Sequence, residues 1–306
     1  MKRREFVSKS VGLGVAGAIA PLFGGFDSLA SKPAVGNRYD MAAVRGGEPV
    51  AMFDKAIEAL GGMKRFVKQG QKVLVKPNIG WDTSPERAAN TNPQLVGHIV
   101  KAAYEAGASE VFVFDHTCDQ WDRCYTNSKI EEAVKANGGT VVPGNNERNY
   151  KEVTIPGGKV LKKAKVHELL LNTDVFINVP ILKHHGSTTV TLGMKNLMGV
   201  VWDRRFYHGN DLSQCIADFL QFRKPDLNII DGYKMMTRNG PRSISEADLV
   251  NLKALIAGTD IVAVDAAATL MFGAKPKDIA HIRIAEEMGH GTTNLESLSI
   301  SRIVIS

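Results

Sequence analysis

The sequence is poor in cysteine and has no apolar run long enough to cross a membrane. Three cysteines in 306 residues cannot form a disulfide framework, and a chain of this length can bury a core without one. The uncharged run over residues 11–26 is shorter than the roughly 18–20 apolar residues of a spanning helix. The composition therefore excludes a small disulfide-rich protein and a multi-span membrane protein.

Several common functional motifs are also missing. The chain has no Gly-rich phosphate loop with its lysine, no G-x-G-x-x-G turn, no G-x-S-x-G elbow and no H-E-x-x-H helix. The charge balance is only mildly basic, with 38 Lys and Arg against 32 Asp and Glu. Without a basic run, a zinc-finger spacing or an aromatic-basic pattern, nucleic acid is not an expected partner. The usual nucleotide-binding and hydrolase classes have no support.

The first 30 residues read as an export signal. A basic start with Arg3-Arg4 precedes a short Gly- and Ala-rich apolar run, and small residues at Ser28 and Ala30 suit a peptidase. The paired arginines resemble a twin-arginine signal. We expect a periplasmic or cell-envelope protein that uses the twin-arginine export machinery and has no stable membrane span after cleavage. A retained anchor is the alternative.

Residues 31–306 are predicted to form a single α/β domain. Short β-branched runs alternate with helical patterns, an order typical of parallel β-α-β units. We therefore predict a mainly parallel open sheet flanked by helices, with an inserted β-hairpin at about residues 143–165 around Pro156-Gly157-Gly158. The expected strands are 72–76, 110–115, 140–142, 174–180, 227–231 and 252–258, and the expected helices are 93–107, 129–139, 212–222, 263–272 and 280–288.

Polar and charged residues collect just after the predicted strands. In open parallel sheets, ligands bind beyond the carboxyl ends of the strands. These positions are Lys76 and Asn78, then Asp115, His116 and Cys118, then Lys183, His184, His185 and Thr188 with Lys195 and Asn196, then Asp231, and finally Thr259 and Asp260. Adjacent histidines cannot both face one ion from the same strand, so His184 and His185 would supply one ligand at most.

Our leading hypothesis is an enzyme that acts on an anionic small molecule. His184 would be the general acid or base, Lys195 would contact the anion, and Asp231 or Asp115 would orient the imidazole or hold a metal. Binding positions would be supplied by Lys76, Asn78, Lys183, Thr188 and Asn196.

Two other functions stay open. Cys118 and Cys124 could form a local disulfide, stay as free thiols, or hold a metal or iron–sulfur cluster with His116 or His184, although their spacing matches no standard cluster motif. Cys215 lies in an apolar helical pattern and is expected to be a buried small side chain. The remaining alternative is a periplasmic binding or accessory protein without turnover.

Four segments in a fixed order resemble the domain-of-unknown-function family 362. They are VLVKPNIG, NVPILKHHGSTTVTLGMKNLMGVV, RKPDLNIIDGYKMMTRNGP and AGTDIVAVDAAATLMFG. The resemblance implies an α/β fold but no assigned reaction. Some members carry a ferredoxin-like C-x-x-C-x-x-C run that this sequence does not show. The family's motif positions would be Lys76, Asn78, Lys183, His184, Thr188, Lys195, Asn196, Asp231, Asp260 and Asp265.

Overall fold

A computed structural model describes residues 38–306. The predicted export signal, residues 1–30, lies outside the described residues. The main sheet is built from the strands β1 (Met41–Arg45), β2 (Lys72–Pro77), β3 (Glu110–Val113), β4 (Thr140–Val141), β7 (Val175–Val179), β8 (Ile181–His185), β9 (Thr189–Thr191), β10 (Leu227–Met236), β11 (Leu249–Gly258) and β12 (Ile300–Val304).

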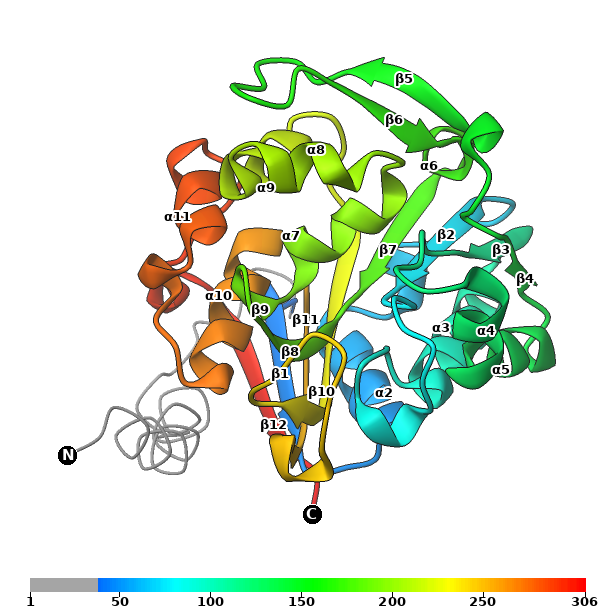
Figure 1. Ribbon diagram of the computed structural model, residues 1–306. Coiled ribbons are helices and arrows are strands. Elements are labelled where there is room, and N and C mark those ends of the chain that lie inside the picture. Colours follow the sequence, from blue (N-terminus) through cyan, green and yellow to red (C-terminus); the bar gives the residue numbers. More distant parts are fainter. Residues whose placement is uncertain (1–37) are drawn as a thin grey trace.

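This ten-stranded sheet runs in the order β12-β1-β11-β10-β7-β2-β3-β4, with β8 and β9 attached beside β10 (Figure 1). The strands from β10 to β4 are all parallel. They are made of nearly continuous apolar residues because helices cover both faces. The predicted mainly parallel sheet is thus confirmed.

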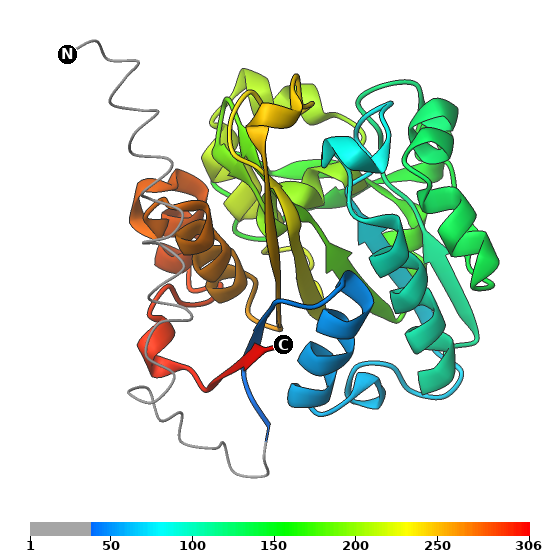
Figure 2. The same ribbon diagram turned by 90° about the horizontal axis from the view of Figure 1, so that it is seen from below.

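Two hydrophobic clusters occupy the two faces of the sheet. Figure 2 shows α2 and α3 on one side of the sheet and α10 and α11 on the other. The helices are α2 (Pro49–Ala59), α3 (Pro93–Ala106), α4 (Trp121–Asn127), α5 (Ile130–Ala136), α6 (Glu168–Asn172), α7 (Gly193–Asn196), α8 (Arg204–Gly209), α9 (Leu212–Phe219), α10 (Ile261–Phe272) and α11 (Ala280–Glu287).

Helix α3 shows how local sequence sets an element's limits. The Asn92 side chain accepts hydrogen bonds from the first turn, and Pro93 occupies the first helical position. At the other end, Gly107 adopts a φ of 117°, which residues with a side chain rarely take. These signals fix the helix almost where the sequence predicts it.

The inserted hairpin is also present. β5 (Tyr150–Thr154) and β6 (Lys163–His167) pair antiparallel as a separate two-stranded sheet. Figure 1 shows this hairpin standing apart from the main sheet, above α8 and α9.

One expected strand end lies on the wrong edge. β11 runs antiparallel to both of its neighbours, β1 and β10, so its carboxyl end points away from the carboxyl ends of β2 and β7. The expectation that Thr259 and Asp260 join the other strand-end residues is therefore wrong. Asp260 instead caps α10 by accepting hydrogen bonds from Val262 and Ala263.

Within residues 38–306, none of the helices combines the length and the apolar character needed to cross a bilayer.

Candidate functional site

A cavity of about 340 Å³ lies beyond the carboxyl ends of β2 and β3. The segment from Thr191 to His208 closes it from the other side. Basic residues dominate its lining, and Asp115 is the only carboxylate there within the described part of the chain. The basic lining residues are Lys76, Lys183, Lys195, Arg204 and Arg205, with His116, His185 and His208.

Lys76, at the end of β2, forms the base of the cavity. Its ammonium is fully buried and lies 2.8 Å from Asp115 Oδ1. It also donates to Asn196 Oδ1 at 3.0 Å and to the carbonyl of Pro77. Burial lowers the pKa of Lys76, while the carboxylate of Asp115 opposes that shift. This lysine therefore has its partners within the protein.

Lys183, on β8, is a second buried ammonium, and it has no carboxylate partner among residues 38–306. It donates to Asn78 Oδ1 at 3.0 Å and to the carbonyl of Ala89, and it lies 5.9 Å from the centre of the Trp81 ring. Burial lowers the pKa of Lys183 to about 7. At neutral pH the amine is close to half protonated.

Lys195, on α7, is the least satisfied of the three. The one contact made by its ammonium in the described structure is a weak one, to Met198 Sδ at 3.5 Å. Burial lowers the pKa of Lys195 to about 8. Nearby, the hydroxyl of Thr191 is buried and has no hydrogen-bond partner in the described structure. Unpaired polar groups cost free energy when buried, so this part of the cavity suits a ligand that would pair them.

Two asparagines hold the segment that carries Lys195 against the sheet. Asn196 Nδ2 donates to Asn178 Oδ1 at 2.9 Å, and Asn78 Nδ2 donates to Asn196 Oδ1 at 3.1 Å. Asn178 lies beside Lys76 in the parallel register of β2 and β7. The sequence analysis did not select Asn178, although a polar residue in the middle of the buried run DVFINVP was the available signal.

Asp265, one of the family motif positions, supports the same segment from α10. Its carboxylate accepts hydrogen bonds from the backbone amides of Gly193 at 2.7 Å and Met194 at 2.9 Å. Burial raises the pKa of Asp265 to about 7. A Cβ on Gly193 would lie 2.7 Å from Asp265 Oδ1, so the close approach requires glycine. Asp265 positions Lys195 without lining the cavity.

The structure places His185 in the cavity and leaves His184 outside it. Side chains alternate between faces along a strand, so Lys183 and His185 share a face and His184 takes the opposite one. His184 Nδ1 accepts from the Gly240 amide at 3.1 Å, and its ring faces Phe272. The geometry does not support the predicted catalytic role of His184 in this cavity.

His185 can donate a hydrogen bond to a ligand. Its Nδ1 accepts from the Ser187 amide at 3.0 Å, so in the neutral ring the proton lies on Nε2. Burial, together with Lys195 and Lys183, lowers the pKa of His185 to about 3. The ring is therefore neutral over the physiological range.

Two other predicted site residues also lie outside the cavity. Asp231 accepts from the amides of Asn92 at 2.8 Å and Tyr233 at 3.1 Å, and burial raises its pKa to about 6. It anchors the start of α3 and does not orient His184. The Thr188 hydroxyl donates to the carbonyl of Val190, a local turn contact.

Cys118, Cys124 and His116 are not brought together as metal ligands. All three cysteines are free thiols, with Cys118 exposed and Cys124 buried. His116 Nδ1 lies 3.0 Å from the Val201 carbonyl. Across residues 38–306, no three His, Cys, Asp or Glu side chains are grouped so as to hold a metal ion. Cys118 does line the cavity, with its sulfur 3.3 Å from a guanidinium nitrogen of Arg204.

The sequence analysis missed the segment VVWDRR, residues 200–205, which follows the segment with Lys195 and Asn196. Arg204 donates to the carbonyls of His116 at 2.8 Å and Thr117 at 2.6 Å, which fixes the loop after β3. Arg205 and His208 also line the cavity. Two adjacent arginines, nine residues after the predicted anion-contacting Lys195, were the available signal.

Comparisons with known proteins confirm the family resemblance that the sequence segments indicated. The model of a family described as Domain of unknown function (DUF362) matches residues 73–269. A relative named Thylakoid-associated protein sll1697, from Synechocystis sp. (strain ATCC 27184 / PCC 6803 / Kazusa), is 28% identical over 264 residues, which cover 82% of this chain and 78% of the relative.

A solved structure, the lactate racemase apoprotein from Thermoanaerobacterium thermosaccharolyticum, is similar with a TM-score of 0.44 and 13% identity. The match covers 83% of this chain and 58% of that chain, so this chain spans less than two thirds of the length of the racemase. The family match includes both the strand ends and the segment 193–199 that enclose the cavity. Over most of its length, from Val73 to Thr269, this chain belongs to the DUF362 family.

Proposed function

We propose that this protein is an enzyme that binds an anionic small molecule in the cavity and exchanges a proton with it. One observation carries the proposal: three buried lysines share a cavity with a single carboxylate of the described chain, and that carboxylate is already paired with Lys76. Buried charges are ordinarily paired, so the positive charge left on Lys183 and Lys195 favours a carboxylate-, phosphate- or sulfate-bearing ligand.

The cavity residues divide into two roles in this proposal. Lys195, the Nε2–H of His185 and the Thr191 hydroxyl hold the anionic group, because their hydrogen-bonding capacity is not used within the described chain. Lys183 is the proton-exchanging group, since its pKa of about 7 lets it accept or donate a proton at neutral pH. This assignment replaces His184 as the acid or base.

Sulfate is a suitable probe of binding because its charge does not change between pH 6 and 9. Calorimetry should show saturable sulfate binding that is weakened at least about tenfold by Lys195→Met, since a hydrogen bond to a charged group contributes about 1.5–3 kcal/mol. Lys101→Met is the matched control, because Lys101 is exposed and pairs only with Glu105 in the described structure.

Proton uptake gives an independent test. An anion beside Lys183 and Lys195 raises both of their pKa values, so binding at pH 7.5 should draw protons from the buffer. Calorimetry in buffers of different ionisation enthalpy measures the number of protons taken up per bound sulfate. Lys183→Met should reduce this number. Sulfate binding without any proton uptake would contradict the role given to Lys183.

Turnover needs a separate experiment. The protein is incubated with a panel of small carboxylates and phosphate esters in D₂O, and ¹H NMR detects both deuterium exchange and product. Activity that Lys183→Met abolishes would support an enzyme. Binding without exchange or product across the panel would favour the binding-protein alternative.

We also propose that the protein is exported by the twin-arginine pathway to the periplasm or cell envelope. The support is the sequence of residues 1–30 alone, with its paired arginines and small residues before the expected cut. Cell fractionation and the N-terminal sequence of the purified protein test it. Replacement of Arg3 and Arg4 by lysines should retain the protein in the cytoplasm.

A further inference from the structure

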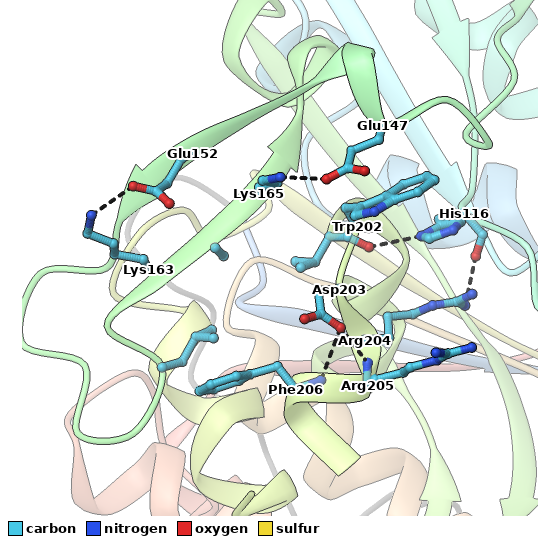
Figure 3. A pocket seen from close by; sticks show the side chains of 13 residues that line it. His116, Glu147, Glu152, Lys163, Lys165, Trp202, Asp203, Arg204, Arg205 and Phe206 are labelled. Atoms are coloured by element: carbon cyan, nitrogen blue, oxygen red, sulfur yellow. Dashed lines mark hydrogen bonds and ion pairs between the residues drawn. The ribbon is translucent and has the colours of Figure 1, made fainter. Parts of the chain in front are cut away.

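A second and larger cavity adjoins the anion-binding one. It measures about 670 Å³ and lies beneath the hairpin β5–β6, between that hairpin and the start of α8 (Figure 3). Its apolar lining comes from Leu161, Ala164, Val201, Trp202 and Phe206. Phe206 is 38% exposed, so part of its ring is available for contact with a ligand.

Four charged residues at this second cavity neutralise one another in two ion pairs. Lys163 pairs with Glu152 at 2.8 Å, and Lys165 pairs with Glu147, both across the hairpin region (Figure 3). Asp203 caps α8 by accepting from the amides of Arg205 and Phe206. In contrast to the inner cavity, this one offers no unpaired buried ammonium, so it favours an uncharged part of a ligand.

Three residues line both cavities: His116, Arg204 and Arg205. The His116 ring stacks on Trp202, with ring centres 4.9 Å apart and planes at 3° (Figure 3). The guanidinium of Arg204 is fixed by the His116 and Thr117 carbonyls, whereas that of Arg205 has no protein partner in the described structure. The Trp202 ring thus stacks on a residue that lines both cavities, and Arg205 supplies an available cation that also lines both.

We propose that the two cavities bind one ligand, an organic anion that carries an aromatic or similarly flat apolar group. The anionic group lies near Lys195 and His185, and the apolar group lies beside Trp202 and Phe206 under the hairpin. This inference rests on the proposed function, since it extends the ligand out of the anion site. It assigns β5–β6 a role in ligand selection.

The experiment compares two anions with the same head group, methanesulfonate and 2-naphthalenesulfonate, by calorimetry with the full chain. A naphthalene ring that loses water-exposed surface beside Trp202 and Phe206 should bind the second anion at least about tenfold more tightly than the first. Trp202→Ala should remove most of this gain and leave methanesulfonate affinity within about twofold. Trp121→Ala is the matched control, because Trp121 lines neither cavity.

Two further measurements make the outcome decisive. Phe206→Ala repeats the test in case Trp202→Ala folds poorly, since Phe206 is partly exposed. Neutral 2-naphthol should bind much more weakly than 2-naphthalenesulfonate. Equal affinity for the two sulfonates overturns the two-cavity inference, while the proposed function stands if Lys195→Met still abolishes methanesulfonate binding. Failure of both sulfonates to bind overturns both proposals.

Discussion

The ammonium of Lys76 and the carboxylate of Asp115 form a 2.8 Å ion pair at the ends of neighbouring parallel strands, with both side chains almost completely buried. The second oxygen of Asp115 accepts from the Ile79 amide at 2.8 Å. Both charges lose their hydration on folding, and each compensates this loss for its partner. Removal of one partner therefore leaves an uncompensated charge in the core.

Asp115→Asn should therefore lower the free energy of unfolding by about 3–5 kcal/mol. The double variant Lys76→Met with Asp115→Leu should recover part of this loss, because it removes both charges. Urea unfolding measures the free energy of unfolding of the single and the double variant. Glu152→Gln breaks an exposed ion pair with Lys163 and should cost less than about 1 kcal/mol. An Asp115→Asn variant as stable as that control would show that Lys76 does not need its partner.

Gly199 is predicted to tolerate no side chain. A Cβ at this position would lie 1.8 Å from Asp115 Oδ1 and 2.6 Å from Lys76 Nζ. Gly199→Ala must therefore push the ion pair apart and should cost at least about 2 kcal/mol in unfolding experiments. Gly186→Ala is the control, since nothing lies within 4 Å of its Cβ position. Equal stability of the two variants would mean that the pair can shift freely.

The adjacent histidines provide a matched pair of variants. His185→Phe should weaken sulfate binding by about tenfold, because it removes the Nε2–H donor of a residue that lines the anion site. His184→Phe should leave sulfate binding unchanged, since His184 lies on the other face of β8 and contacts the Gly240 amide. Calorimetry with sulfate compares them. The reverse order of effects would restore His184 as the site residue.

Stability should rise with pH between about 7 and 9. Burial lowers the pKa of Lys183 to about 7 and that of Lys195 to about 8, whereas both keep a pKa near 10.4 in the unfolded chain. Above the folded pKa, the unfolded state binds the extra proton, so each lysine adds up to about 1.4 kcal/mol of stability per pH unit. Well below pH 7 both lysines are protonated in the folded and the unfolded state, and they contribute no pH dependence there.

Urea unfolding at pH 6, 7, 8 and 9 measures this slope. Lys183→Met should flatten it, and Lys101→Met should leave it as in the unchanged protein. A slope that does not differ between the two variants would show that Lys183 titrates normally in the folded state.

Cys118 should report the positive potential of the cavity. It is exposed beside Arg204, whereas Cys124 and Cys215 are buried. The quantity to measure is the rate of Cys118 alkylation by the anion iodoacetate divided by the rate with neutral iodoacetamide. This ratio should be about tenfold higher in the folded protein than in the unfolded chain, because clustered cations concentrate anions. Lys195→Met and added sulfate should both lower the ratio, as mass spectrometry of the Cys118 peptide can measure. A ratio that neither Lys195→Met nor added sulfate changes would argue against an anion site here.

The sequence predicted the parallel strands well, because a strand that is covered on both faces consists of an unbroken run of apolar residues. Polar residues at such runs do meet in space: Lys76 near the end of β2, Asn78 directly after β2 and Lys183 within β8 line one cavity. The same runs carry no information about which side chain faces which layer, because both faces are buried. The choice between His184 and His185 therefore needed the strand's orientation.

Strand direction was the other missing quantity. β11 ends in an apolar run like those of the parallel strands, yet it runs antiparallel to both of its neighbours, so Asp260 lies at the opposite edge of the sheet. Asp231 lies within β10, which continues to Met236, and it contacts the start of α3 outside the cavity.

By itself, the sequence determined the family, the class of fold, the limits of helices such as α3 and the identity of all three lysines at the site, because these depend on local patterns and on motifs in order. Only the tertiary structure decided that Lys183 meets Asn78, 105 residues away, and that Lys195 has no carboxylate beside it in the described chain. Pairing and burial arise between distant segments, and they bring three lysines together in one cavity with a single carboxylate of the described chain.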